Sequence, residues 1–507
     1  MEKIDFSQPA RRKRAVYWHV AGGWLTNVIF IVQGLVLIPI YLEYLGDRLY
    51  GFWLATGGVL AWLSMVDVGA SSVTQQRCAS AYSKLDMEGV LSYFWHGAIV
   101  MFGVLLTFSL FLYGIGLKIG DWLQIDRELR NIIVSCFYVA GIAAIGRLAN
   151  DFLRVFASSL QRNQYPVFAQ TLGDFFGLVG IIVSLIVFKL GLWSLVIGAL
   201  LRSGIPLVIN LTHTSYILYS IGGKLHWSSK IFSDYLKTTP AVLAAKASGQ
   251  FSMNLPAVLI TRFIGPEANV AYSVTIRVIQ MVQSFINHAL SGLYAACAHY
   301  FNDATVSTKG MKKTVSDLAV GYFVASSTGV SLYALFNNGF VNLWTSEAQF
   351  SGQLFTTLAA LSSFLHVRDT MFVGMGNSMG AILEIGLTRA IENVISAGIT
   401  IAGIYFLGVI GAPIAVIIAA LIMQSFYFRI YRKQNSVVAE ALFQLCWLWL
   451  PLTLFLIGCY FGSKFFVHDT WLSFVLSCSI GALPFGLYFV YLLPGMRQRL
   501  TGMIGRA

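Results

Sequence analysis

The chain has 507 residues, of which 57% are hydrophobic and only 11% are charged, and its mean hydropathy is +0.71. A soluble globular protein carries about 25% charged residues, so this composition argues against a soluble protein. The formal net charge of +12 would suit a nucleic-acid-binding protein, but the positions of the basic residues fit membrane topology instead.

Fourteen apolar runs follow one another along the chain, each long enough for a membrane-spanning helix, which needs about 20 apolar residues. A total of twelve or thirteen helices also fits, because some boundaries are indistinct. The first run follows the basic residues 11–14 and is longer than the apolar core of a signal peptide, so we expect it to be retained. The predicted runs are 16–41, 50–72, 93–117, 132–156, 167–188, 192–218, 239–263, 269–294, 317–343, 354–376, 381–407, 411–430, 441–461 and 471–493.

The connections between these runs would lie alternately on the inner and outer sides of the membrane, and they differ in their content of basic residues. With the N-terminus inside, 21 lysines and arginines fall on the inner side and 7 on the outer side. This excess follows the positive-inside rule and predicts an even number of helices, with both termini in the cytoplasm. The basic residues that remain within the runs are Arg147, Arg202, Lys246, Arg277, Arg368 and Arg389.

A weak internal repeat divides the sequence into two halves. YLGDRLYGFW (Tyr44–Trp53) resembles RFIGPEANVAY (Arg262–Tyr272), and the turn around Asn163 resembles the turn around Asn377. Parallel repeats of this kind place a binding site between two lobes. We therefore predict a cytoplasmic basic tail (1–15), an N-terminal lobe of helices 1–6 (16–218), a cytoplasmic linker (219–238), a C-terminal lobe of helices 7–12 (239–433), and two additional helices with a cytoplasmic tail (434–507).

Polar residues form a stripe within the apolar stretch TIRVIQMVQSFINHALS, Thr275–Ser291. Spacings of three and four residues place on one helix face Arg277, Gln280 or Gln283, Ser284, Asn287 or His288, and Ser291. A charged side chain facing lipid costs at least about 2.5 kcal/mol, so we expect the stripe to face a water-filled cavity. A seam of hydrogen bonds between helices is the alternative for the amides.

The basic residues within the runs outnumber the deeper acidic residues, which predicts a positively charged cavity suited to an anion such as a phosphate. Arg368 adjoins Asp369, and Glu392 lies three residues after Arg389, so these pairs are alternatively structural. The candidate substrate-binding residues are Arg147, Arg202, Lys246, Arg277, Arg389, Asn27, Gln250, Gln280 and Asn287.

Several titratable groups within the runs are candidates for ion coupling, because burial shifts protonation toward neutral pH. Structural hydrogen bonding is the alternative role for each of them. The candidates are Asp67, Asp174, Glu384, Glu392 and His288.

Signatures of catalysis and metal binding are not found in the sequence. The 6 cysteines are scattered without a CxxC pair, and there is no GxxxxGK[ST], HExxH or GxSxG motif. GMGNSMG (Gly374–Gly380) has no strand before it, so we interpret it as a tight turn. No connection is long enough to fold as a soluble catalytic domain. We therefore expect a protein that is not an enzyme and has no cofactor, metal or catalytic residues.

The stretch LIPIYLEYLGDRLYGFWLATGGVLAWLSMVDVGASS (Leu37–Ser72) resembles the opening of bacterial polysaccharide and O-antigen flippases. That pattern, roughly LG-x3-YG-x-W followed by L-x-x-D-x-G, is matched at Leu45, Gly46, Tyr50, Gly51, Trp53, Asp67 and Gly69. QRNQY (Gln161–Tyr165) resembles the turn before their fifth helix. These flippases belong to the multidrug/oligosaccharidyl-lipid/polysaccharide (MOP) exporter superfamily.

The resemblance implies an all-α integral membrane protein with about 14 transmembrane helices: two six-helix lobes with pseudo-two-fold symmetry around a central cavity, plus two C-terminal helices. It also implies a multi-pass protein of the bacterial inner membrane that flips an undecaprenyl-pyrophosphate-linked oligosaccharide to the outer leaflet by alternating access. The implied partners are the lipid-linked oligosaccharide, the bilayer, and the polymerase and chain-length proteins of the same pathway, but no nucleic acid.

Two other interpretations stay open. A multidrug cation exporter of the same superfamily would need a negatively charged cavity, which the arginines within the runs argue against. A membrane glycan polymerase or ligase is the weaker third interpretation, because such enzymes usually have a sizeable outer loop.

Overall fold

The structure is a computed structural model that describes residues 12–63, 70–222, 227–287, 308–443, 447, 449–466 and 470–480. These residues are helical or lie in short connections, and none of them forms a strand. For parts of α1 and α7 only the backbone is described. Contacts divide the chain into two compact units, Met1–Asn254 and Leu255–Ala507, with the division inside α7.

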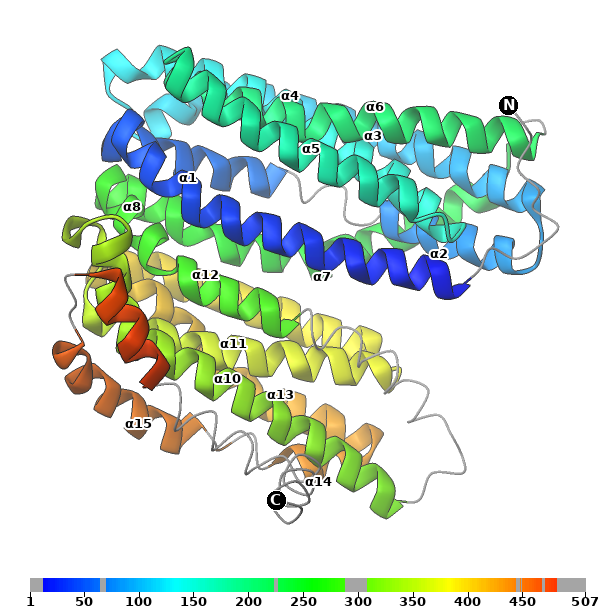
Figure 1. The fold of residues 1–507 in the computed structure, drawn as a ribbon. Helices are drawn as coiled ribbons and strands as arrows, with labels where there is room; N and C mark the ends of the chain where they lie inside the picture. Colours follow the sequence, from blue (N-terminus) through cyan, green and yellow to red (C-terminus); the bar gives the residue numbers. More distant parts are fainter. Residues whose placement is uncertain are drawn as a thin grey trace, which may run out of the picture. The chain divides into compact units, whose positions relative to one another are not determined.

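The described part of unit 1 contains, in order, α1 (Arg12–Leu63), α2 (Ala70–Ser83), α3 (Met87–Trp122), α4 (Arg127–Ser159), α5 (Gln164–Ile182), α6 (Trp193–Ile221) and the first part of α7 (Ser229–Phe263). A π-helical turn, Val183–Val187, extends α5. Helices α5 and α6 run side by side (Figure 1). Glycines make this approach close, because a Cβ at Gly198 would lie 2.2 Å from Ile181.

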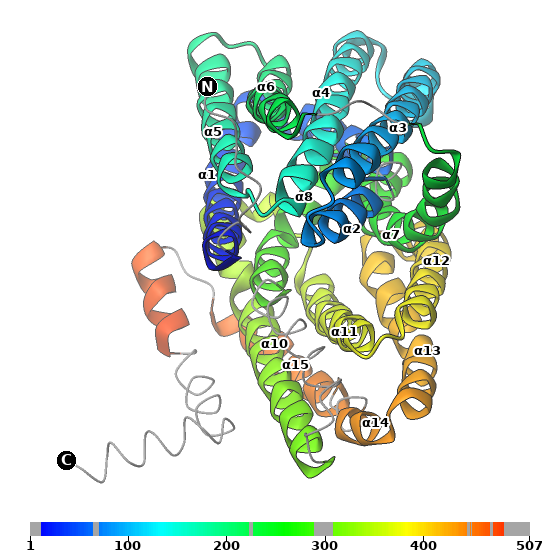
Figure 2. The ribbon, with the colours of Figure 1, turned by 90° about the vertical axis from the view of Figure 1, so that its right-hand side faces the viewer.

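Unit 2 contains the end of α7, α8 (Pro266–Thr275), a helical stretch at 277–287, α10 (Thr308–Trp344), α11 (Gln353–Ser378), α12 (Ile382–Leu407), α13 (Gly411–Gln434), α14 (Ser436–Phe443) and α15 (Trp449–Gly462). Helices α12 and α13 lie side by side (Figure 2). Their apolar faces pack with α10 and α11 into a core that includes Val315, Ile385 and Tyr427.

Glycines begin a new helical segment at equivalent places in the two proposed repeats. Gly46 has φ 72° and ψ 163° and bends α1 sharply, whereas Gly265 has φ 141° and ψ 160° and precedes α8. Both values of φ are unfavourable for residues that carry a Cβ. The expected turn at Gly374–Gly380 is also present, since α11 ends at Ser378 and Gly380 has φ 86°.

Two helices extend beyond the apolar runs predicted for them. The second predicted run ends at 72, whereas α2 continues to Ser83, because its polar second half is held by packing against α3 and α4. The seventh run was predicted to begin at 239, yet α7 begins at Ser229. Hydropathy marks the part of a helix that suits lipid, and it does not mark where the helix begins or ends.

The start of α7 is tied to α2 and α3 within unit 1. The Tyr235 hydroxyl donates to the Tyr93 carbonyl (2.9 Å) and lies 2.9 Å from the Thr74 hydroxyl. Asp234 pairs with Arg77 at 2.7 Å, and the Ser228 amide donates to the His96 ring (3.0 Å). Much of the predicted linker is therefore a packed part of unit 1.

Six helical segments in the described part of the chain are long and apolar enough to cross a membrane: Met87–Trp122, Arg127–Ser159, Gln164–Val187, Trp193–Ile221, Gly310–Trp344 and Leu383–Gln434. The last of these joins α12 and α13. Such helices indicate a multi-pass membrane protein. The total of fourteen, the two-lobe symmetry and the predicted domain boundaries stay predictions.

Candidate functional site

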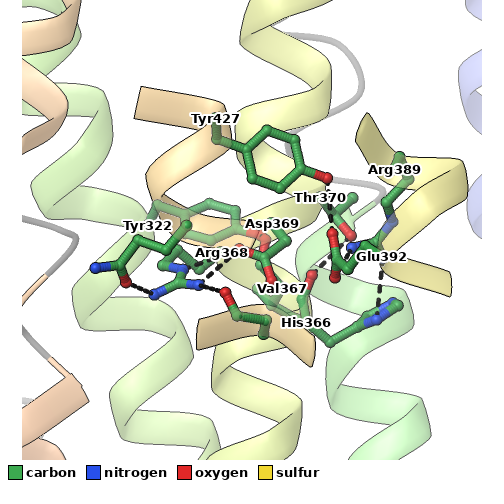
Figure 3. Close-up of polar contacts among 11 residues, drawn as sticks. Tyr322, His366, Val367, Arg368, Asp369, Thr370, Arg389, Glu392 and Tyr427 are labelled. Atoms are coloured by element: carbon green, nitrogen blue, oxygen red, sulfur yellow. Dashed lines mark hydrogen bonds and ion pairs between the residues drawn. The ribbon is translucent and has the colours of Figure 1, made fainter. Parts of the chain in front are cut away.

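Unit 2 holds a buried network of two arginines and two carboxylates on α11 and α12 (Figure 3). Arg368 bonds the Asp369 carboxylate at 2.8 Å, and the two side chains are only 2% and 0% exposed. Arg389 bonds Glu392 at 2.6 Å, with 15% and 6% exposed. The charges of Arg389 and Glu392 also act on Asp369. Two positive and two negative charges make this network neutral.

Neutral partners complete the network from neighbouring helices. Arg368 donates to the Gln424 side chain (2.7 Å) and the Ala420 carbonyl (3.2 Å) on α13. Tyr427 of α13 donates to Glu392 (2.7 Å), and Arg389 lies 3.1 Å from the His366 ring on α11. A buried charge is tolerated when it is paired and hydrogen-bonded. These contacts join three helices, so they support a structural role for the network.

Glu384 lies apart from this network at the beginning of α12. It accepts from Lys433 (3.3 Å) and from Gln434 (3.0 Å) at the end of α13. Its side chain is 41% exposed and that of Lys433 is 75% exposed. The two coupling candidates of α12 therefore differ in place: Glu384 makes a surface contact, and Glu392 lies in the interior of unit 2.

A second polar cluster lies in unit 1. Gln170 donates to the Asp174 carboxylate (3.1 Å), one turn apart on α5, and Gln33 of α1 donates to the Asp174 carbonyl (3.0 Å). The charges of Arg202 on α6 and Arg147 on α4 both act on the Asp174 carboxylate. Two positive charges and one negative charge leave this cluster with an excess of one positive charge.

Arg202 is half-buried, and its Nε and Nη2 have no hydrogen-bond partner among the described residues. Its side chain lies against α5, where a Cβ on Gly177 would be 2.2 Å from the Arg202 Cγ and 2.9 Å from its Nε. Gly177 follows Asp174 by three residues and so shares its helix face. The missing side chain at Gly177 therefore leaves room for Arg202 on α5, one helical turn from Asp174.

The stretch 277–287 is helical, as predicted, and begins after a break at Ile276. Arg277 and Asn287 are half-buried, and Gln280 is exposed. Gln283 donates to the Ser363 hydroxyl on α11 (2.8 Å). Gln283 therefore makes one hydrogen bond between helices, of the kind that the alternative for the amides predicts.

The remaining predicted residues are placed less fully. Gln250 is exposed on α7 and accepts from Asn254 through its carbonyl (2.9 Å). Asn27 and Lys246 lie on α1 and α7, but their side chains are outside the described part of the structure. Asp67 and His288 lie outside the described residues altogether.

Sequence reasoning did not connect the neutral members of either cluster with the charged ones. Gln170 precedes Asp174 by one helical turn, a spacing that could have identified it. His366 and Tyr427 come from helices distant in sequence, and no local pattern connects them with Arg389 or Glu392.

Comparison with known proteins adds to this geometry. Residues 98–324 match the family model described as "Polysaccharide biosynthesis protein". A Salmonella typhi protein named "Putative O-antigen transporter" is 28% identical over 127 residues, which are 25% of this chain and 29% of that protein. The resemblance to the polysaccharide flippases of the MOP superfamily is confirmed. The family match contains the QRNQY element and begins after the Leu37–Ser72 motif.

Solved structures of MOP transporters share the fold. An inward-facing multidrug resistance MATE family transporter has a TM-score of 0.61 at 13% identity, covering 83% of this chain and 95% of its own. An outward-facing one has a TM-score of 0.61 at 14%, covering 86% and 99%. A Vibrio cholerae MATE transporter in its bent form has a TM-score of 0.55 at 13%, covering 84% and 99%. These likenesses show a MATE-like helical fold.

Proposed function

We propose that this protein flips an undecaprenyl-pyrophosphate-linked oligosaccharide, an O-antigen or exopolysaccharide repeat unit, from the inner to the outer leaflet of the bacterial cytoplasmic membrane. The observation that carries the proposal is the match of residues 98–324 to the polysaccharide biosynthesis family. The relative named as an O-antigen transporter supports the same substrate class.

The charge of the unit 1 cluster agrees with this substrate. A lipid-linked pyrophosphate is strongly anionic, and guanidinium groups bind phosphate oxygens in pairs. The excess positive charge around Arg202 and Arg147 suits such a ligand. In this proposal two lobes alternate in access around the substrate, with both termini in the cytoplasm.

Ion coupling is the second part of the proposal. Asp174 is half-buried beside two arginines, so its proton affinity depends on whether an anion or water screens their charge. Glu392, Glu384, Asp67 and His288 are the further candidates. The polymerase and chain-length proteins of the same pathway are proposed as the partners that use the exported unit.

Deletion of the gene in its host tests this function directly. We expect lipid-linked oligosaccharide to accumulate on the inner leaflet and surface polysaccharide to decrease, and a plasmid-borne copy of the gene should restore both. Unchanged surface polysaccharide and no accumulation would refute the proposal.

A multidrug cation exporter is the second candidate, because the solved structures of similar fold include multidrug transporters. Increased sensitivity of the deletion strain to cationic dyes, with normal polysaccharide, would favour it. Loss of surface polysaccharide with unchanged dye sensitivity would exclude it.

A further inference from the structure

The two polar clusters differ in net charge, and this difference indicates that their arginines have different roles. In unit 2, Arg368 and Arg389 each bond a carboxylate at 2.8 Å or less. Arg368 is 2% exposed, so no group outside the helices can reach its guanidinium. The charges of the unit 2 arginines are therefore already balanced by carboxylates of the protein itself.

In unit 1, neither Arg202 nor Arg147 has a salt bridge among the described residues, although both act on Asp174 at longer range. Arg147 is exposed. The Asp174 carboxylate instead accepts from the neutral amide of Gln170 at 3.1 Å. Since a desolvated guanidinium without hydrogen-bond acceptors is costly, the buried Nε and Nη2 of Arg202 are poised for an acceptor that the described protein does not supply.

Gly177 determines where that acceptor would bind. A side chain at this position would collide with Arg202 Cγ and Nε. The glycine allows the aliphatic part of Arg202 to lie flat on α5, which restricts the guanidinium to the neighbourhood of Asp174. A guanidinium held in one orientation loses little entropy when it forms a bidentate contact with a phosphate.

We infer that Arg202, assisted by Arg147, binds a phosphate group of the transported lipid within unit 1, and that Arg368 and Arg389 stabilise unit 2 without binding substrate. This inference rests on the proposed function for the identity of the lipid. The binding chemistry itself is common to any phosphate-bearing lipid, so the test separates the transported lipid from ordinary anionic phospholipids.

The test uses the purified full-length protein in nanodiscs of phosphatidylcholine, titrated with inorganic pyrophosphate and followed by calorimetry. We expect binding by the wild type, and at least about tenfold weaker binding by Arg202→Gln, since a charge-assisted hydrogen bond is lost. Arg202→Lys should bind better than Arg202→Gln but less well than the wild type. Gly177→Ala should also weaken binding, because it moves Arg202 without removing the charge.

Two control variants match these changes. Arg154→Gln removes an arginine of the same helix as Arg147, but one that pairs with Asp151 at 3.2 Å. The double variant Arg368→Met/Asp369→Asn removes the fully buried ion pair of unit 2 while leaving that network neutral. Both should bind pyrophosphate as the wild type does. Monodisperse elution during size-exclusion chromatography establishes that each variant is folded.

Three results would overturn the inference: no binding of pyrophosphate by the wild type, an affinity of Arg202→Gln within about twofold of the wild type, or an equal loss in the Arg368→Met/Asp369→Asn variant. If undecaprenyl pyrophosphate competes with pyrophosphate and phosphatidylglycerol does not, the site is selective for the transported lipid. Equal competition by both lipids would refute that selectivity. The deletion phenotype is independent of this site. If the deletion strain accumulates lipid-linked oligosaccharide but Arg202→Gln binds pyrophosphate normally, the site is refuted and the function is not. If binding depends on Arg202 but the deletion strain has normal surface polysaccharide, the function is refuted and the site is not.

Discussion

Arg277 carries a positive charge in a mostly apolar helical stretch, and its side chain is half-buried. A charge at such a position is usually functional, because desolvation is costly. We predict that Arg277→Ala lowers export of the glycan at least about tenfold while the protein remains inserted, measured as surface polysaccharide per unit of membrane-bound protein.

The chemistry of the contact determines how well a second substitution restores transport. Arg277→Lys should restore export partly if charge is sufficient, and poorly if a bidentate contact is required. Arg432→Ala, an exposed arginine near the end of α13, is the control and should leave export unchanged. Normal export by Arg277→Ala at a normal membrane level would remove Arg277 from the substrate path.

The Arg368–Asp369 pair leads to a prediction about stability. Arg368→Ala leaves the fully buried Asp369 carboxylate without its counter-charge, so we expect a loss of about 3–5 kcal/mol in the free energy of unfolding. The double variant Arg368→Met/Asp369→Asn removes both charges and should recover most of this loss. Thermal unfolding in detergent measures both, and equal stability of the two variants would contradict the prediction.

At the scale of elements, the approach of α12 and α13 depends on two glycines. A Cβ on Gly411 would lie 2.0 Å from the carbonyl carbon of Gly403, and a backbone cannot move aside as a side chain can. We predict that Gly411→Ala destabilises unit 2 by about 1–3 kcal/mol, as overpacking commonly does.

A glycine on the same helix as Gly403 provides the control for this substitution. A Cβ at Gly398 would meet nothing within 4 Å, so Gly398→Ala should be neutral or stabilising because alanine favours the helix. A melting temperature for Gly411→Ala no lower than that for Gly398→Ala would contradict the close approach.

Hydropathy predicted the long helices well and their ends poorly. The cores of α3, α4, α5 and α6 coincide with four predicted runs, since each is a continuous apolar segment. The polar end of α2 and the beginning of α7 extend past the apolar stretches, and their helical structure depends on packing against neighbouring helices. Tertiary packing supplies most of a helix's stability, so composition alone does not locate its ends.

At the scale of the whole molecule, sequence spacing predicted contacts within a helix and missed contacts between helices. The pairing of Arg389 with Glu392 followed from their spacing of three residues. The position of Arg202 against Gly177 did not, because it joins α6 to α5 through the tertiary fold. The contrast between a neutral and a positively charged cluster therefore became visible only in the structure.

The contacts of Ser228, Asp234 and Tyr235 with α2 and α3 have a consequence for how the chain could be divided. A gene cut between the codons for Gly222 and Trp227 would give two polypeptides, and the second would begin with a segment that belongs to the first. That segment would act as a docking strap, so co-expressed halves should find each other in the membrane without a covalent connection. Cutting after Tyr235 instead would leave this segment on the first polypeptide, and the second polypeptide would lack these contacts with α2 and α3.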